Sequence, residues 1–251
     1  MLEEGEKIKE TIRICSIDIG WKNFCICVEE YSLEALDQIE NTSSSSQYYN
    51  PDGTPTLEIK DILNTLYSIG KIIHYENYDI SKGTQTTAKY LDPQVYHIMY
   101  DKLRENKDIF STCDIILVEQ QVRFGKMCNP KCCDLGQHCR SYFIFEFGLG
   151  DKKVIEFPAY HKTQVHGCPK DTVKDKRGRD KYISMPKKKR KDWAIEKTRE
   201  ILELRGDEEH LELFSKKPRK KGVIKVKLDD LADSLLQSIS WVYMNYIEKK
   251  K

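Results

Sequence analysis

Carboxylates at the ends of apolar segments constrain this chain more than any other feature of its sequence. Asp18 closes the apolar run 12–17, and Glu119 closes a second run, 115–118. Short apolar runs rich in isoleucine and valine predict buried strands. An acid at the end of a buried strand is costly unless it finds partners. We therefore expect both acids at an open edge of a sheet, where strand ends commonly form active sites.

A third acidic position lies where an apolar helix is predicted, over 229–247. Asp230 and Asp233 are three residues apart and share a helix face. Asp229 and Asp233 are four apart and could share it too, although an acid in the first turn can also serve only the helix dipole. Together with the two strand-end acids, this helix predicts a site for two divalent cations. Two such ions are the usual apparatus for hydrolysing a phosphodiester.

The apolar patterns predict an α/β fold with a mixed sheet. Strands are expected over 12–19, 23–30, 70–79, 114–119 and 153–157, and helices over 92–107, 131–148, 191–205 and 229–247. Strands followed by helices in this order are typical of a sheet that is covered on both faces. The polar stretch 41–56 has a composition typical of disorder. The basic stretch 168–190 is predicted to be a mobile insertion.

Charge is distributed unevenly along the chain. Residues 1–160 hold 17 Lys and Arg against 25 Asp and Glu, whereas residues 161–251 hold 25 against 15. A basic segment beside an acidic one favours a polyanionic partner, above all nucleic acid, with a solvated surface as the alternative. No apolar run approaches membrane-spanning length, so we expect a soluble intracellular protein without a membrane partner. The acidic start, 1–6, argues against a secretory signal or a mitochondrial transit peptide.

Nine cysteines without a secreted-scaffold spacing indicate a reducing compartment with free thiols. The possible zinc ligands lie within twelve positions, and they are Cys128, Cys132, Cys133, His138 and Cys139. Thiolates and imidazoles bind zinc tetrahedrally. A helix over 131–148 would separate Cys132 from Cys139 by about two turns, which is too far for one ion. Buried cysteines that bind no metal are the alternative interpretation.

Four short motifs resemble those of the RuvC-like Holliday junction resolvases. They are Ser16-Ile17-Asp18-Ile19-Gly20 with Asn23, Val118-Glu119-Gln120, Leu135-Gly136-Gln137 and Asp230-Leu231-Ala232-Asp233. The segment 227–233 is similar to that of the resolvases of poxviruses and other large DNA viruses. The yeast mitochondrial resolvases are a second branch, which the acidic N-terminus disfavours.

The resemblance implies an RNase H-like fold with a mixed five-stranded sheet flanked by helices. Residues 1–251 would form one nuclease domain with insertions at 31–60 and 168–190. The implied activity is symmetric nicking of four-way DNA junctions by a homodimer, in recombination and repair, with Mg2+ (or Mn2+ in its place) and no organic cofactor. The positions of the family's catalytic, metal-binding acids fall on Asp18, Glu119, Asp230 and Asp233. A viral protein of this kind would act in the cytoplasm of an infected cell or in the virion.

Basic residues complete the predicted site. Lys162 resembles the family's lysine after the fifth strand, and Lys191 resembles the lysine that starts the next helix, with Lys189 as its replacement after a small shift of register. Such a lysine would neutralise charge on the scissile phosphate, or would only contact a phosphate or solvent. The basic stretches 170–191 and 216–227 would contact phosphates without reading sequence. The predicted DNA contacts are Arg123, Phe124, Lys126, Lys131, Lys187, Lys188, Lys189 and Arg190.

Several alternatives stay open at the level of the sequence. Phe124 is either a wedge at an opened junction centre or a packed aromatic side chain. Another RNase H-like nuclease, acting on RNA–DNA hybrids or linear duplexes, would use the same acids. A junction-binding protein without catalysis would keep the same fold, and a structural DNA-binding protein would use the cysteines to hold zinc.

Overall fold

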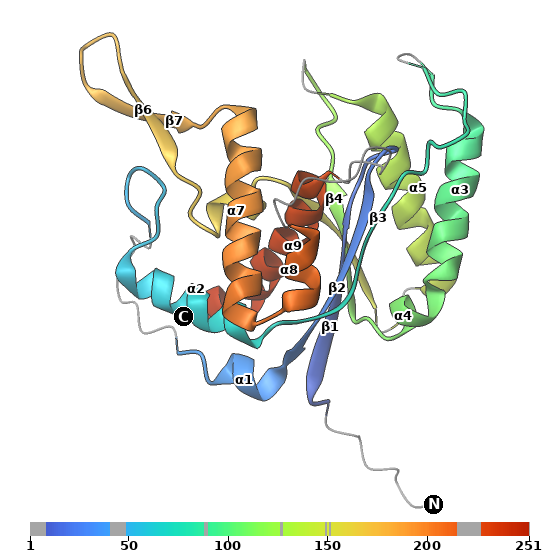
Figure 1. Cartoon of the computed structure of the whole chain (residues 1–251), viewed down its shortest axis with the longest axis horizontal. Coiled ribbons are helices and arrows are strands. Elements are labelled where there is room, and N and C mark those ends of the chain that lie inside the picture. The colour runs from blue at the N-terminus through green and yellow to red at the C-terminus, as the bar shows by residue number, and fades with distance from the viewer. Residues whose placement is uncertain are drawn as a thin grey trace, which may run out of the picture.

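A twisted sheet with helices on both faces forms the body of the molecule (Figure 1). The computed structural model describes residues 9–40, 49–87, 90–125, 128–148, 150, 152–214 and 227–250. The sheet has five strands in the order β3-β2-β1-β4-β5. Their bounds are β1 (Thr11–Asp18), β2 (Phe24–Ser32), β3 (Lys71–Tyr78), β4 (Ile115–Gln120) and β5 (Lys153–Pro158). The predicted mixed five-stranded sheet flanked by helices is confirmed.

The central strand β1 determines where the acids lie. It pairs antiparallel with β2 and parallel with β4, while β2 and β3 are antiparallel and β4 and β5 are parallel. In the β1–β4 ladder Ile17 is opposite Val118. The carboxyl ends of parallel strands meet at the same edge of a sheet. Asp18 and Glu119, one residue beyond this pair, are therefore neighbours, as the sequence predicts.

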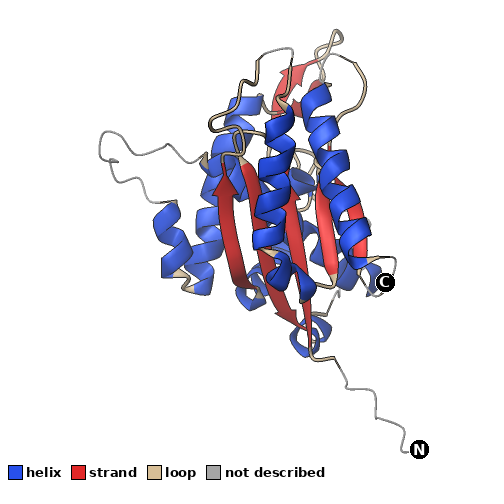
Figure 2. Cartoon of the chain, turned by 90° about the vertical axis from the view of Figure 1, so that its right-hand side faces the viewer, coloured by secondary structure: helices blue, strands red, loops and turns tan. Residues whose placement is uncertain are grey.

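Helices lie on both faces of the sheet (Figures 1 and 2), and a hydrophobic cluster lies on each face. Alternate residues of β1 enter different clusters: Ile14 belongs to the cluster on one face, and Ile17 belongs to the cluster on the other. This explains why the strands are apolar on both faces. The first face is covered by α2 (Leu57–Ile69), α7 (Lys187–Arg205) and α9 (Leu228–Val242), and the second by α3 (Pro93–Glu105) and α5 (Pro130–Phe147).

Short elements connect these layers. The helices are α1 (Leu33–Asp37), α4 (Lys107–Ser111), α6 (His161–Gln164) and α8 (Glu208–Leu213), and α9 continues into a π-helical turn (Tyr243–Ile247) and a 3-10 turn (Glu248–Lys250). A separate hairpin consists of β6 (Lys170–Lys174) and β7 (Asp180–Ser184). No helix in the described parts of the chain combines the length and the hydrophobicity needed to cross a bilayer. All nine cysteines are free thiols.

Helix α2 is absent from the sequence-based prediction, although its pattern is helical. Ile59, Ile62, Leu63 and Leu66 are buried at the spacing of one helix face. The side chain of Thr56 caps the first turn by accepting a hydrogen bond from the backbone N–H of Ile59. The signal for α2 was therefore present in the local sequence. The predicted disordered stretch just before it lies partly, at 41–48, outside the described residues.

The two ranges predicted as insertions contain regular elements. The range 31–60 holds the end of β2, α1 and the start of α2. The range 168–190 holds the β6–β7 hairpin and the first turn of α7, which begins at Lys187 and not at residue 191 as predicted. The hairpin projects beyond the N-terminal end of α7 (Figure 1). That these ranges are insertions in a single domain stays a prediction.

A buried ion pair joins α7 to the sheet. Arg205 Nη2 lies 2.8 Å from Glu29 Oε1 of β2, and the two side chains are 4% and 0% exposed. Arg205 Nε also donates to the backbone carbonyl of Tyr67, at 2.7 Å. A Cβ atom at Gly70 would lie 2.3 Å from Arg205 Nη2, so the guanidinium fits only because this position lacks a side chain. A buried ion pair therefore fixes the C-terminal end of α7 to the sheet.

Candidate active site

Three acids from three elements surround the ammonium group of Lys162. Lys162 Nζ lies 2.7 Å from Glu119 Oε1, 3.1 Å from Asp18 Oδ1 and 3.4 Å from Asp233 Oδ2. The lysine side chain is 4% exposed. The ends of β1 and β4, the first turns of α9 and the short helix α6 therefore meet at one point, which brings three of the four predicted acids together with Lys162.

The remaining two acids form a neighbouring group with different lysines. Asp230 lies 2.9 Å from Lys227 Nζ and 3.6 Å from Lys191 Nζ. Asp229 forms an ion pair with Lys191. Asp229 therefore shares Lys191 with Asp230. The helix phase places only Asp233 of this motif at the Lys162 group.

Lys191, and not Lys189, is the α7 lysine that reaches the acids. Lys189 Nζ lies 3.5 Å from Asp171 Oδ1 of the hairpin instead. The two residues are two positions apart on a helix, and they therefore point to different sides. The shift of register that would put Lys189 in the place of Lys191 is therefore not needed.

The acids differ in their protonation equilibria. Burial raises the pKa of Asp18 well above its usual value, and the nearby Glu119 charge adds to this against the attraction of Lys162. Burial likewise raises the pKa values of Asp230 and Asp233. Burial also acts to raise the pKa of Glu119, but Lys162 and hydrogen bonds outweigh it and lower that pKa. The group combines crowded carboxylates with lysines that offset their repulsion.

The carboxylate oxygens of the site are suitable ligands for a hard divalent cation, but their present positions are not suitable for holding one. Carboxylate oxygens are the ligands that Mg2+ prefers. Within the part of the chain that the structure describes, no three His, Cys, Asp or Glu side chains surround a common point closely enough to hold an ion. Asp18, Glu119 and Asp233 face the Lys162 ammonium instead. A cation site would need these side chains to rearrange.

Helix α6, which carries Lys162, is anchored by a buried histidine. The ring N–H of His166 donates to the carbonyl of Leu236 in α9 (Nε2–O 2.9 Å), and Nδ1 accepts from the hydroxyl of Tyr67 (2.8 Å). The carbonyl can only accept, so Nε2 carries a proton, and in the neutral ring Nδ1 is then the acceptor for the Tyr67 hydroxyl. His166 is 2% exposed, and burial lowers its pKa to about 4.

His166 should make stability depend on pH. Its pKa is about 4 when folded and about 6.5 when unfolded, so the stabilisation is complete above pH 6.5 and is lost as the pH falls towards 4. Between pH 7 and pH 5 the wild-type protein should lose about 2 kcal/mol more unfolding free energy than His166→Gln. Urea unfolding at both pH values measures this difference. His97→Gln, on an exposed position of α3, should follow the wild type; equal slopes for wild type and His166→Gln would contradict the assignment.

Two glutamines in the site were not singled out from the sequence. Gln121 Nε2 donates to Glu119 Oε2 at 2.6 Å and orients the carboxylate. Gln237 Nε2 donates to Ser16 Oγ at 3.0 Å, which ties α9 to β1. Gln121 directly follows β4, the strand that carries Glu119, and this position was the sequence signal for its role. Gln237 had none, since its partner is remote in the sequence.

A cleft of about 360 Å3 opens beside the acids, and basic residues form one wall. Glu119 and Asp233 line it together with Lys162, while Lys187, Arg190 and Lys191 come from the first turn of α7. Two of the predicted DNA-contacting residues, Lys187 and Arg190, therefore stand next to the carboxylates. An anionic strand in this cleft would meet cations on one side and the acids on the other.

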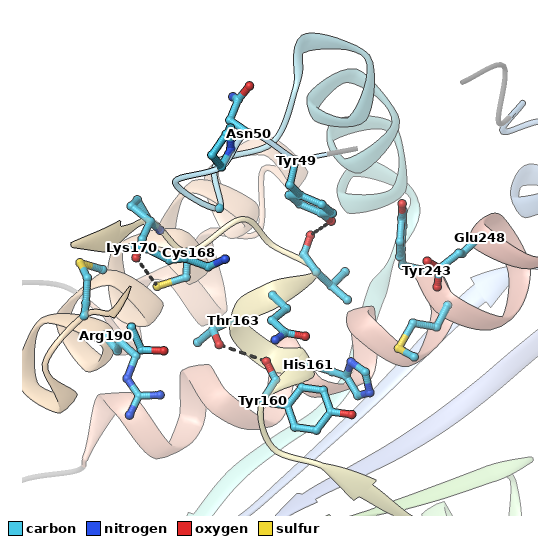
Figure 3. A pocket seen from close by; sticks show the side chains of 18 residues that line it. Tyr49, Asn50, Tyr160, His161, Thr163, Cys168, Lys170, Arg190, Tyr243 and Glu248 are labelled. Atoms are coloured by element: carbon cyan, nitrogen blue, oxygen red, sulfur yellow. Dashed lines mark hydrogen bonds between the residues drawn. The ribbon is translucent and has the colours of Figure 1, made fainter. Parts of the chain in front are cut away.

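A larger pocket of about 520 Å3 adjoins this cleft (Figure 3). Tyr160, Thr163 and Arg190 line both cavities. On the far side, Tyr49 and Tyr243 form part of its wall (Figure 3). The pocket lies along α6, whose other residues line it while Lys162 faces the acids. Helix α6 therefore separates the two cavities.

The predicted DNA contacts that follow Glu119 lie outside the cleft lining. Phe124 is 87% exposed, so the interpretation as a packed aromatic is wrong. Arg123 Nη2 lies 2.8 Å from Glu156 Oε1, in an exposed ion pair. Lys126 lies outside the described residues. An exposed phenylalanine beside an arginine leaves the wedge interpretation standing as a prediction.

Two further predicted contacts, Lys131 and Lys188, are not among the residues that line the cleft. Lys131 donates to the carbonyl of Thr87, and its ammonium lies 4.8 Å from the ring centroid of Trp21. Lys188 is exposed on the first turn of α7. Most of the basic stretch 216–227 is outside the described residues. These positions stay predictions as phosphate contacts.

The cysteine-rich segment does not form a zinc site in the described residues. Cys132 and Cys139 are buried in the hydrophobic cluster between α5 and the sheet. His138 Nδ1 lies 3.0 Å from the hydroxyl of Tyr100, and its ring contacts Tyr96. No cluster of three possible ligands is found in those parts of the chain. The zinc alternative therefore receives no support.

Solved structures that resemble the chain include three resolvases. The fowlpox virus resolvase in complex with Holliday junction DNA is 18% identical, with 93% of this chain and 98% of that chain covered and a TM-score of 0.46. RuvC of Thermus thermophilus is 13% identical, with 93% of this chain and 95% of that chain covered and a TM-score of 0.45. The yeast mitochondrial resolvase Ydc2 is 12% identical, with 98% of this chain and 89% of that chain covered and a TM-score of 0.48. At such identities and TM-scores, these likenesses do not transfer an activity to this chain.

Sequence comparison identifies one viral relative. No protein-family model matches the chain. Uncharacterized protein 170L of Invertebrate iridescent virus 6 is 30% identical over 248 residues, which are 95% of this chain and 93% of that protein. Because the similarity extends along nearly the whole of both proteins, this chain belongs to the same family as protein 170L of Invertebrate iridescent virus 6.

Proposed function

We propose that this chain is a Mg2+-dependent endonuclease that resolves four-way DNA junctions by paired nicks. The observation that carries the proposal is the convergence of Asp18, Glu119 and Asp233 at the edge of a cleft with a basic wall. Acids alone support a metal-dependent phosphodiesterase. The resemblance of the four sequence motifs to RuvC-like resolvases supports the junction as substrate.

In the proposed reaction, Asp18, Glu119, Asp230 and Asp233 would hold Mg2+, or Mn2+ in its place. When bound, the ions supply an activated water and charge stabilisation at the leaving oxygen. The attacking water would give up a proton and bond through its oxygen to phosphorus while the P–O3′ bond breaks. The leaving O3′ takes up a proton, so the products are a 5′-phosphate and a 3′-hydroxyl. No organic cofactor takes part.

The basic residues of the cleft bind and orient the strand. Lys187, Arg190 and Lys191 are placed to contact phosphates on either side of the bond that is cut. Such contacts position DNA without reading its sequence. Binding should therefore weaken steeply as salt is raised. Two matched cuts need two sites related by a twofold axis, so the active form is proposed to be a homodimer. As its relative is viral, the proposed setting is recombination and repair of viral DNA in an infected cell.

A substrate comparison tests the proposal. Purified full-length protein is incubated with a four-way junction, with a linear duplex of one arm's sequence, and with the corresponding RNA–DNA hybrid. We expect Mg2+ or Mn2+ to support nicking of the junction at symmetric positions, and EDTA to abolish it. The nicked products should be closed by DNA ligase, since the ends are a 5′-phosphate and a 3′-hydroxyl.

The other outcomes separate the alternatives. Equal cleavage of the hybrid or the linear duplex would identify a different RNase H-like nuclease. Tight junction binding without cleavage in either metal would identify a non-catalytic junction-binding protein, and the proposal would then be wrong.

A further inference from the structure

The position of the Lys162 ammonium is unusual for a phosphate-binding lysine. It is buried and lies within 3.4 Å of one oxygen from each of Asp18, Glu119 and Asp233. These are three of the four acids that the proposed function assigns to cation binding. A lysine that only contacted DNA would point into the cleft with its charge in water.

The three acids have no other close cation among the described residues. Lys191, whose charge also acts on Asp233, forms its ion pairs with Asp229 and Asp230. Crowded carboxylates in a buried site repel one another unless a positive charge lies among them. Lys162 supplies that charge, as a metal ion would. Its three contacts also explain why the acids do not close around a common point of their own.

We infer that Lys162 is a displaceable occupant of the cation site. Its ammonium holds the three carboxylates together and must leave before they can bind an ion, because Nζ occupies the point that all three carboxylates face. The inference rests on the proposed function for the identity of the site. The long lysine stem can swing without moving α6, since a lysine carries its charge on four flexible carbons.

The displaced ammonium has a place to go. Lys162 lines the cleft with Lys187 and Arg190, where the strand is proposed to bind. Leaving the acids would bring the ammonium towards the scissile phosphate. Ion binding and delivery of the lysine to the substrate would then be one movement. Lys162 would balance the charge of the carboxylates before ions bind, and it would contact the phosphate after they bind.

Removing the competing charge should strengthen ion binding. Mn2+ is titrated at pH 8 into full-length wild-type protein and into Lys162→Met, and free Mn2+ is followed by its electron paramagnetic resonance signal. We expect Lys162→Met to bind Mn2+ at least tenfold more tightly. Lys187→Met removes the same charge from the cleft wall without touching the acids, and it should change the affinity less than threefold. An affinity of Lys162→Met equal to or below that of the wild type, or an equal gain in both variants, would overturn the inference.

A measurement on the wild-type protein covers the case in which Lys162→Met does not fold. The 15N signal of a buried, ion-paired ammonium is separated from those of exposed lysines by slow hydrogen exchange. We expect the signal of Lys162 to be present without ions and to be lost on saturation with Mg2+. Persistence of the signal at saturating Mg2+ would contradict displacement.

Different results would contradict the proposed function and the displacement of Lys162. If the wild type binds no Mn2+ and leaves junctions intact, the proposed function fails and the inference fails with it. If the wild type binds Mn2+ and cuts junctions while the Lys162 signal is unmoved, only the displacement is wrong.

Discussion

Replacing Asp18 by Asn is expected to slow junction cleavage by on the order of 1,000-fold or more, while junction binding changes only a few-fold. Asp18 ends β1 at the centre of the acid group and is 6% exposed. The amide keeps the shape of the side chain but removes one of the negative charges that the proposed ions need. Binding depends mainly on the basic wall of the cleft, which the variant leaves intact.

Single-turnover cleavage and gel-shift titrations of the same four-way junction measure the two effects. Asp61→Asn is the matched control, because Asp61 lies on an exposed position of α2. It should cleave like the wild type. Cleavage by Asp18→Asn at the wild-type rate would show that the catalytic site lies elsewhere. Should Asp18→Asn unfold, Glu119→Gln provides the same test from β4.

Replacing Arg205 by Met is expected to lower the free energy of unfolding by about 3–5 kcal/mol. The loss arises because Glu29, with a fully buried side chain, would keep its charge without a partner. The hydrogen bond from Arg205 Nε to Tyr67 would be lost as well. Urea unfolding of the wild type and the variant measures the difference.

A double variant separates the charge from the packing. Glu29→Leu combined with Arg205→Met removes both charges and should recover most of the loss, to within about 1–2 kcal/mol of the wild type. Arg104→Met is the control for an exposed pair: Arg104 and Asp101 are 67% and 62% exposed, and breaking their contact should cost less than about 1 kcal/mol. Losses of equal size in Arg104→Met and Arg205→Met would refute the role assigned to burial.

The strands could be predicted because their signal is local. Apolar runs such as 115–118 form strands wherever a sheet can bury both faces, and all five predicted strands are present. The β6–β7 hairpin could not be predicted in this way. Its strands are exposed and half of their residues are charged, without the alternation that marks a half-buried strand, and they are held by backbone pairing.

By itself, the sequence determined that acids would meet at one edge of a sheet. It did so because Asp18 and Glu119 each end an apolar strand, and parallel neighbours bring such ends together. Only the tertiary structure decided which charges face each other. Lys162 lies among three carboxylates because His166 and its partners in α9 fix α6 against the core, and Asp229 with Asp230 turns to Lys191 because of the phase of α9. These contacts join residues remote in the chain, and their geometry follows from how helices pack on the sheet, which no local pattern encodes.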